Sequence, residues 1–155
     1  MNEHKIMIID RSIQDTLYLF KESGWFICEQ NEKSLTLNNI DWDKVLTKTV
    51  LSGREKEIDG RERLARLKKN GYTLLDIGVA ETILKNPKFF PETWKRKTNK
   101  GNFIRISFDG TILQNRESGY QCSFFLYWED GFARINNFFL DTQIPLSTVS
   151  AILGD

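Results

Sequence analysis

Carboxylates are the side chains of this sequence whose types and spacing could most readily do chemistry. The candidates are five that lie at expected turns or strand ends in its last third: Asp109, Glu117, Glu129, Asp130 and Asp141. Asp and Glu can bind Mg²⁺ or share acid and base roles, so one hypothesis is a metal-dependent hydrolase built from Asp109, Glu129 and Asp141. However, Asp109-Gly110 and Asp130-Gly131 are dipeptides typical of hairpin turns, where Asp tolerates positive φ. We therefore expect turns at both positions.

The other residue types that enzymes use are scarce. His4 is the only histidine, and it lies in a segment expected to fray, so a Ser-His-Asp triad or a multi-histidine metal site is disfavoured. Cys28 and Cys122 lack CxxC spacing and sit in apolar runs, which predicts two reduced, buried thiols. The chain has no Gly-rich phosphate loop. We predict a protein with no catalytic residues, no metal and no cofactor.

A second candidate is the basic and aromatic stretch KNPKFFPETWKRKTNKG, residues 85–101. It contains six Lys or Arg against one Glu, with Phe89, Phe90 and Trp94 among them. Cations can follow a phosphate backbone while an aromatic ring stacks on a base. One alternative function is therefore nucleic-acid binding, with Trp94 stacking and with these cations: Lys95, Arg96, Lys97 and Lys100. The opposing interpretation places the Phe residues in the core and the lysines on a solvated face.

The densest aromatic stretch is FFLYWEDGFARINNFFLD, residues 124–141, in which seven of eighteen residues are Phe, Tyr or Trp. Strand alternation sends Phe124, Leu126 and Trp128 to one face and Phe125 and Tyr127 to the other. A sheet that is apolar on both faces is either covered twice or exposes one side to a partner. Core packing is the commoner use of strand aromatics. The alternative, an exposed recognition surface, makes Tyr127 and Trp128 candidate binding residues.

Composition narrows the class of protein. A chain of 155 residues with 40% hydrophobic and 28% charged residues fits one globular domain that folds without disulfides. The net charge of +1 gives no global attraction to nucleic acid or to a membrane, so any polyanion site must be local. No apolar stretch is long enough to span a bilayer and no secretory leader is evident. We predict a cytoplasmic protein of bacterial, phage or mobile-element origin.

Hydrophobic periodicity predicts that residues 1–95 are mainly helical with short strands. The expected elements are a strand at 5–9, a helix at 12–23, a hairpin at 25–30 and 34–37, and helices at 41–52, 54–69 and 76–86. A strand is the alternative for 41–52, because that range is rich in β-branched residues. Asp76 is expected to cap the last helix, and Asn86-Pro87 is expected to end it.

The period changes to two in the C-terminal part. Strands are expected at 102–108, 111–114, 120–128 and 132–140, separated by Asp-Gly or Ser-Gly dipeptides. Residues 101–141 therefore predict an antiparallel meander of about four strands.

Several of these segments together resemble a family of small, uncharacterised bacterial and metagenomic proteins. The segments are LLDIGVAETILKNPKFFPETWK at 74–95, GTIL at 110–113, FLYWEDG at 125–131 and FFLD at 138–141. The family shares a stretch similar to LNANVLDYLLANPELIPEEWK, then IFFWGTIYR, then a tyrosine- and tryptophan-rich hairpin ending like NWLD. Asp109 stands where the family has a tryptophan, and Ala133, Ile135 and Phe138 replace tryptophans of the hairpin. The resemblance implies an architecture and no chemistry.

Taken together, the sequence predicts a single α+β domain over residues 1–155, with N-terminal helices and a short hairpin packed on the C-terminal meander. The predicted function is that of a small non-catalytic binding or regulatory protein. It would meet a macromolecular partner, a protein in the first instance, through the aromatic sheet and the adjacent basic segment. The residues expected to bind are Trp94, Lys95, Arg96, Lys97, Lys100, Tyr127 and Trp128.

Overall fold

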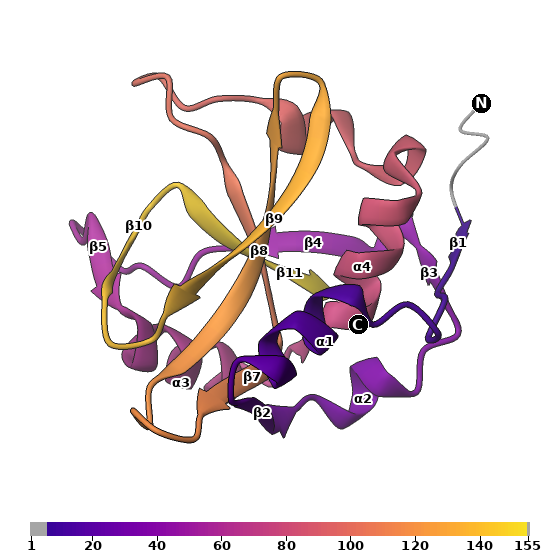
Figure 1. The fold of residues 1–155 in the computed structure, drawn as a ribbon. Helices are drawn as coiled ribbons and strands as arrows, with labels where there is room; N and C mark the ends of the chain where they lie inside the picture. The colour runs from indigo at the N-terminus through magenta and orange to yellow at the C-terminus, as the bar shows by residue number, and fades with distance from the viewer. Residues whose placement is uncertain (1–5, 155) are drawn as a thin grey trace.

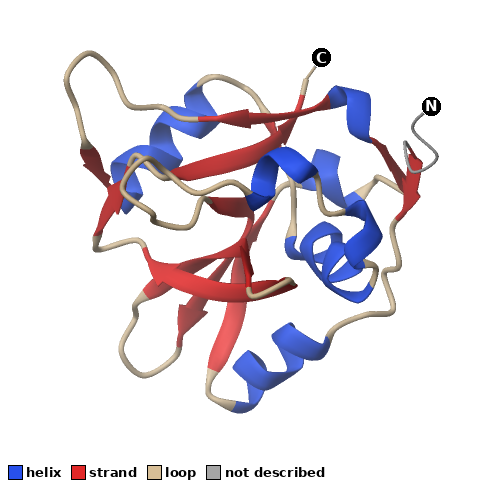
Figure 2. Ribbon diagram, turned by 90° about the horizontal axis from the view of Figure 1, so that it is seen from above, coloured by secondary structure: helices blue, strands red, loops and turns tan. Residues whose placement is uncertain are grey.

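The protein has an α+β fold, as predicted, in a computed structural model that describes residues 6–154 (Figure 1). Within residues 6–154, four α-helices accompany a mostly antiparallel sheet of seven strands and two small two-stranded sheets. Figure 2 shows helices beside the strands on more than one side. None of the helices within residues 6–154 is long and apolar enough to cross a membrane. His4 lies outside the described residues.

The elements have the following bounds. The helices are α1 Asp15–Glu22, α2 Glu32–Leu35, α3 Gly60–Lys69 and α4 Ile77–Lys85, with 3-10 turns η1 Trp42–Lys44, η2 Pro87–Phe89 and η3 Glu92–Lys95. The main sheet contains β2 Trp25–Gln30, β4 Val45–Lys48, β6 Thr73–Leu74, β7 Arg105–Asn115, β8 Gln121–Glu129, β9 Phe132–Phe139 and β11 Thr148–Leu153. The small sheets pair β1 Ile6–Ile8 with β3 Asn39–Asp41, and β5 Glu57–Asp59 with β10 Gln143–Pro145.

The main sheet draws strands from the whole length of the chain. Its order is β4-β11-β7-β8-β9, with β2 also paired to β7 and β6 to β11. The β11–β7 pair is parallel, with Thr148 opposite Arg105, and the other pairs are antiparallel. The predicted four-strand meander is therefore correct for the order β7-β8-β9 but omits the four strands that flank them.

The turn predicted at Asp109-Gly110 is wrong. Strand β7 runs through both residues, which are buried, and its register with β8 shifts between Phe108 and Leu113. At this point the segment leading into α4 crosses the strand, and the Gly110 N–H donates to the carbonyl oxygen of Leu75 at 2.9 Å. A Cβ on residue 110 would lie 2.2 Å from the carbonyl oxygen of Leu74. Glycine occurs here because two backbones approach closely, not because the chain turns.

The turn predicted at Asp130-Gly131 is confirmed. It joins β8 to β9, and both residues have positive φ, 51° and 83°. Two central residues with positive φ match the twist of the flanking strands, which is why Asp-Gly is favoured in such a two-residue loop. The register then runs without a break from Glu129 opposite Phe132 to Cys122 opposite Phe139.

Three predictions for the first half need correction. The range 34–37 is not a strand: Asn31 caps the short helix α2 by accepting a hydrogen bond from the Ser34 N–H at 3.0 Å. Residues 41–52 form no α-helix, because β4 pairs with β11 and only one 3-10 turn precedes it. Helix α3 begins at Gly60 rather than near residue 54, since Asp59 caps it and β5 comes before it.

Helix α4 agrees with its prediction at both ends. Asp76 caps it by accepting a hydrogen bond from the Gly78 N–H at 2.9 Å, and the helix ends at Lys85, one residue before Asn86-Pro87. Most apolar residues of this helix, including Val79 and Ile83, are buried in the core, and Leu84 is partly buried against it.

Both faces of the central strands are covered. Phe124 and Leu126 lie in clusters with side chains of α1 and α4, whereas Phe125, from the opposite face of the same strand, lies in a cluster with Leu64 and Leu67 of α3. The interpretation of the strand aromatics as core residues is therefore confirmed for these positions. The accessible residues of the aromatic stretch lie mainly toward the turn between β8 and β9, and Phe139 is exposed at the other end of β9.

Candidate functional site

The two aromatic candidates of β8 lie on opposite faces of the hairpin. Tyr127 and Trp128 are consecutive in a regular strand, so their side chains point to opposite sides. Both are half-buried. They therefore do not form one flat platform, and the predicted aromatic surface divides into two.

On the Trp128 face, the aromatic residues belong mainly to the core. Trp94 is 6% exposed and packs edge-on against Trp42 and Phe90, and Phe90 in turn lies 5.0 Å from Trp128 between ring centroids. Because Trp94 is enclosed, it offers no face on which a base could stack, and that part of the nucleic-acid prediction is wrong. Its role in the structure is to fix η3.

Lys95 completes the Trp128 face. Its Nζ lies 4.2 Å from the centroid of the Trp128 ring and 2.8 Å from Glu92 Oε1. An ammonium over an indole face is attracted by the ring quadrupole. Lys95 is thus held in place by a ring and a carboxylate, and its charge is already partly balanced.

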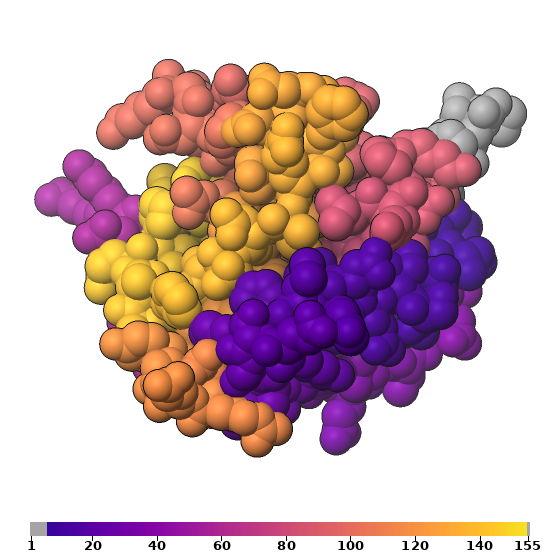
Figure 3. Space-filling view, viewed as in Figure 1, coloured from indigo at the N-terminus to yellow at the C-terminus, as the bar shows by residue number. Residues whose placement is uncertain are grey.

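On the Tyr127 face, the basic segment joins the sheet through a second ring. Phe103 forms an isolated antiparallel bridge with Lys97, closing the loop between them, in which Gly101 has a φ of 79°. The Phe103 ring lies 5.6 Å from that of Tyr127, and Lys97 Nζ lies 5.2 Å from the Phe103 centroid. The segment around residue 100 and the β8–β9 hairpin accordingly lie side by side at the upper margin of the molecule (Figure 3).

Two arginines that the sequence reasoning missed extend this face. Arg134 of β9 is exposed and stands directly opposite Tyr127 in the register, and its Nε lies 3.6 Å from Glu129 Oε1. Arg105, also exposed, places its guanidinium 4.9 Å from the centroid of Phe125, one ring below Tyr127. Strand alternation across a hairpin could have placed Arg134 beside Tyr127. We call the set Lys97, Phe103, Arg105, Tyr127 and Arg134 the basic–aromatic surface.

A hollow of about 300 Å³ adjoins the basic–aromatic surface. Phe103 and Arg105 line it together with Gly101, Asn102, Pro145 and Ser147, so it lies between the loop that follows η3 and the connection from β10 to β11. The Arg105 N–H donates to the carbonyl oxygen of Ser147 at 2.9 Å, which fixes one wall to the other. Arg96 and Lys100, the remaining predicted cations, are exposed on the neighbouring loop.

The carboxylates of the hydrolase hypothesis do not form a site. Asp109 lies in the centre of β7, Glu129 next to the hairpin turn, and Asp141 pairs with Arg61 at 2.6 Å beyond the far end of β9. Among residues 6–154, no three His, Cys, Asp or Glu side chains are grouped so that they could hold a metal ion. The proposed trio of Asp109, Glu129 and Asp141 is therefore wrong as a metal site.

Asp109 is instead the centre of a buried polar network. It accepts hydrogen bonds from the hydroxyls of Ser107, Ser123 and Ser150 at 2.5 to 2.9 Å and is paired with Arg63. Burial alone would raise the pKa of Asp109, but the Arg63 charge and the serine hydroxyls outweigh it and leave the pKa below its usual value. With its hydrogen bonds to protein groups complete, this carboxylate has a structural role.

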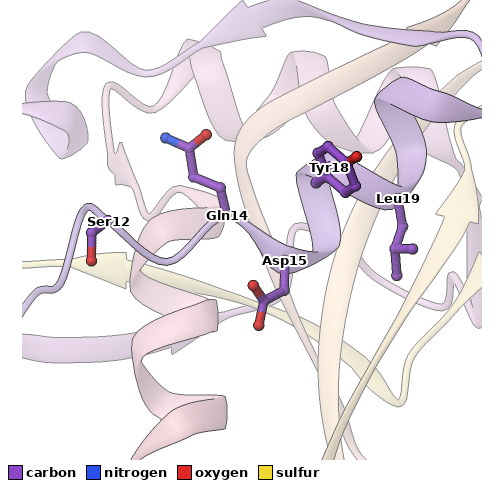
Figure 4. A pocket seen from close by; sticks show the side chains of 5 residues that line it. All are labelled: Ser12, Gln14, Asp15, Tyr18 and Leu19. Carbon is purple, nitrogen blue, oxygen red and sulfur yellow. The ribbon is translucent and has the colours of Figure 1, made fainter.

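A shallow hollow also lies beside the start of α1 (Figure 4). Its lining comes from a single stretch, Ser12 to Leu19, and the side chains of Gln14 and Asp15 point in different directions. Asp15 is engaged with Lys85 of α4 at 2.9 Å. Diverging side chains from one short stretch of chain cannot converge on a ligand, so this hollow is not a site.

The fold thus places Lys97, Arg105 and Arg134 around Tyr127. The other predicted binding residues on this part of the sheet, Trp94, Lys95 and Trp128, lie on the opposite face. No family model, curated protein or solved structure matches this chain.

Proposed function

We propose that this protein is a small non-catalytic binding or regulatory protein, and that its basic–aromatic surface contacts an acidic region of a protein partner. The observation that carries the proposal is the contact between Phe103 and Tyr127 at 5.6 Å, with Lys97 stacked on one ring and Arg134 opposite the other. Half-buried rings flanked by exposed cations are the kind of group that anchors protein interfaces.

Local charge supports an acidic partner. The whole chain carries a net charge of only +1, yet Lys97, Arg105 and Arg134 are exposed on one face, and Glu129 is the carboxylate paired there, with Arg134. Complementary charge across an interface speeds association and fixes register. A partner surface rich in Asp and Glu would find these cations already oriented by the rings beneath them.

The test is a binding measurement with a defined acidic probe. We expect fluorescein-labelled poly-L-glutamate to bind the wild-type protein at low salt, and a Tyr127→Ala, Arg134→Ala double variant to bind at least about tenfold more weakly. A matched control replaces two exposed residues from elsewhere in the chain, Lys33→Ala and Lys69→Ala, which changes the net charge by one unit more. Equal affinity of the double variant and the wild type would remove this surface as the site.

Nucleic acid is the second candidate. Four cations lie within six residues, Lys95 to Lys100, and Phe103 supplies a half-buried ring beside them in place of the enclosed Trp94. Binding of a single-stranded oligothymidylate should then weaken with salt, with a log–log slope of about −0.7 per phosphate contacted. A flat salt dependence, or a preference for poly-L-glutamate at matched charge, would leave the protein-partner proposal in place.

A further inference from the structure

A cleft lies among α1, α2 and α4, and none of its lining residues belongs to the basic–aromatic surface. Its volume is about 250 Å³, and its lining comes from the loop before α1 and from α1, β2, α2, α4 and β7. Three of these elements, α1, α2 and α4, lie together in one part of the molecule (Figure 1). Part of the lining is aliphatic, including Leu17, Ile27 and Leu35. Polar groups from different elements converge in such clefts when they hold small molecules.

Glu81 is a buried carboxylate with one free oxygen in this cleft. The residue is 1% exposed, and its Oε1 accepts a hydrogen bond from the Thr16 N–H at 2.7 Å, so it satisfies a free amide at the start of α1. Its Oε2 is buried and has no hydrogen-bond partner among residues 6–154. Burial raises the pKa of Glu81 above its usual value. A buried oxygen without a donor is costly, and a ligand that supplies a donor removes that cost.

Arg11 lines the same cleft and is held there by three other residues. Its Nη1 lies 2.6 Å from Asp76 Oδ2, and its Nη2 donates to the carbonyl oxygens of Ser34 and Leu37 at 2.8 and 3.1 Å. A Cβ at Gly78 would lie 2.5 Å from Arg11 Nη1, so the guanidinium occupies the space that this glycine leaves.

Gly78 and Glu81 are three residues apart on α4 and therefore share a face of the helix, which places the guanidinium one turn from the carboxylate. The Nε of Arg11 is buried and has no hydrogen-bond partner within the described chain. The lining of the cleft also includes Lys21, which is exposed. The cleft thus combines an acceptor that lacks a donor with cationic groups that can receive an anion.

We propose that this cleft binds a free aliphatic α-amino acid. The ammonium group donates to Glu81 Oε2, the carboxylate meets Arg11 Nε and Lys21, and the aliphatic side chain covers Leu17, Ile27 and Leu35. A zwitterion is the ligand that satisfies both groups at once, since an amine alone would leave Arg11 Nε without an acceptor and an acid alone would face the Glu81 carboxylate. The site is independent of the basic–aromatic surface.

The test uses L-leucine, L-valine and L-methionine as probes. Their binding is measured by isothermal titration calorimetry and by changes in backbone amide chemical shifts. We expect saturable binding of at least one, with shifts at Thr16 and Leu17, whose neighbour Glu81 takes the ammonium group. For L-leucine as the probe, the matched analogues are isopentylamine, which lacks the carboxylate, and 4-methylpentanoic acid, which lacks the ammonium group; both should bind at least about tenfold more weakly.

The variant that isolates the interaction is Glu81→Gln. Its side-chain oxygen can still accept from Thr16, so the protein should remain folded while affinity for the amino acid falls at least about tenfold. Glu117→Gln, at an exposed position after β7, is the control and should bind as the wild type does. Absence of saturable binding for all three amino acids, or undiminished affinity of folded Glu81→Gln, would overturn the proposal.

Discussion

Arg63 of α3 and Asp109 of β7 form an ion pair inside the protein, with 3.0 Å between Nη1 and Oδ1 and side-chain exposures of 4% and 1%. Arg63 Nη2 also donates to Ser107 Oγ at 2.7 Å, and that hydroxyl donates to Asp109 Oδ2. The pair joins a helix to the middle of the sheet. Removing one partner would leave the other charge buried without compensation.

Asp109→Ala should therefore destabilise the protein by about 3–5 kcal/mol, because Arg63 would stay buried with its main counter-charge gone. Asp141→Ala removes the partner of Arg61 in an ion pair that is about half exposed, and should cost about 1 kcal/mol or less. The free energy of unfolding in urea measures both. If the two variants lost equal stability, the buried ion pair would contribute no more to stability than the exposed one. Replacing both Arg63 and Asp109 by Met and Leu should cost less than Asp109→Ala alone.

Gly110→Ala should also be strongly destabilising. The added methyl group would lie 2.2 Å from the Leu74 carbonyl oxygen and 2.7 Å from the Leu75 carbonyl carbon, and backbone atoms cannot move aside as a flexible side chain can. The free energy of unfolding should fall by about 3 kcal/mol or more, since the two crossing backbone segments must move apart. Gly154→Ala is a fair comparison, because its nearest neighbour is the Leu46 side chain at 3.1 Å. Thermal denaturation of the two should show a much lower Tm for the Gly110 variant.

Substitutions at Trp94 and Tyr127 should affect different properties, stability for Trp94 and binding for Tyr127. Trp94→Ala opens a cavity among Trp42, Phe90 and Phe108 and should cost about 3–5 kcal/mol of unfolding free energy. Tyr127→Ala, at a half-buried position, should cost less stability and reduce binding of the acidic probe more. Denaturant unfolding and probe affinity measured on the same samples check both. A Trp94 variant that is stable but does not bind would contradict this assignment.

The pH dependence of stability should differ between the wild type and Glu81→Gln. Because the pKa of Glu81 is raised in the folded state, this group contributes stability below its unfolded value of about 4.5, and that contribution is lost as pH rises through the folded pKa. Asp109 has a lowered pKa, so its contribution is present above its unfolded value and is lost in acid, in both proteins alike. The stability of the wild type minus that of Glu81→Gln should fall between pH 4.5 and neutral pH without amino acid. A stability difference that stayed constant over this range would show that folding does not raise the pKa of Glu81.

The two Asp-Gly dipeptides show what sequence patterns can and cannot settle. At Asp130-Gly131 nothing but the two strands competes for the backbone, so the local preference for positive φ decides and the prediction is confirmed. At Asp109-Gly110 the same dipeptide continues a strand, because Arg63 and the serines hold the carboxylate and a second backbone crosses the glycine. Those partners are up to 46 residues away in sequence, so the residues around Asp109 do not indicate them.

The same distinction applies to the other elements. Helix α4 has its cap, its apolar face and its stop within eleven residues, and all three could be recognised. Strand β4 depends on β11, with Lys48 opposite Ser150, so its helical spacing was misleading. For the site, Lys97 and Tyr127 were predicted, and the two-residue turn could also have placed Arg134. The position of Arg105 depends on β7, whose register with β8 shifts, and Glu81 resembles any helical glutamate until α1 covers it.

The central place of β11 affects the order in which the sheet can form. This strand lies between β4 on one side and β7 with β6 on the other, although it is the last strand along residues 6–154. During synthesis, β7, β8 and β9 can pair as soon as they emerge, whereas β4 and β6 must wait for a strand made some 75 to 100 residues after them. Closing loops of that length is slow. A nascent chain halted before Thr148 would therefore hold three unjoined parts of one sheet, namely β4, β6 and the group of β2, β7, β8 and β9. Their exposed edges are what a chaperone would need to shield.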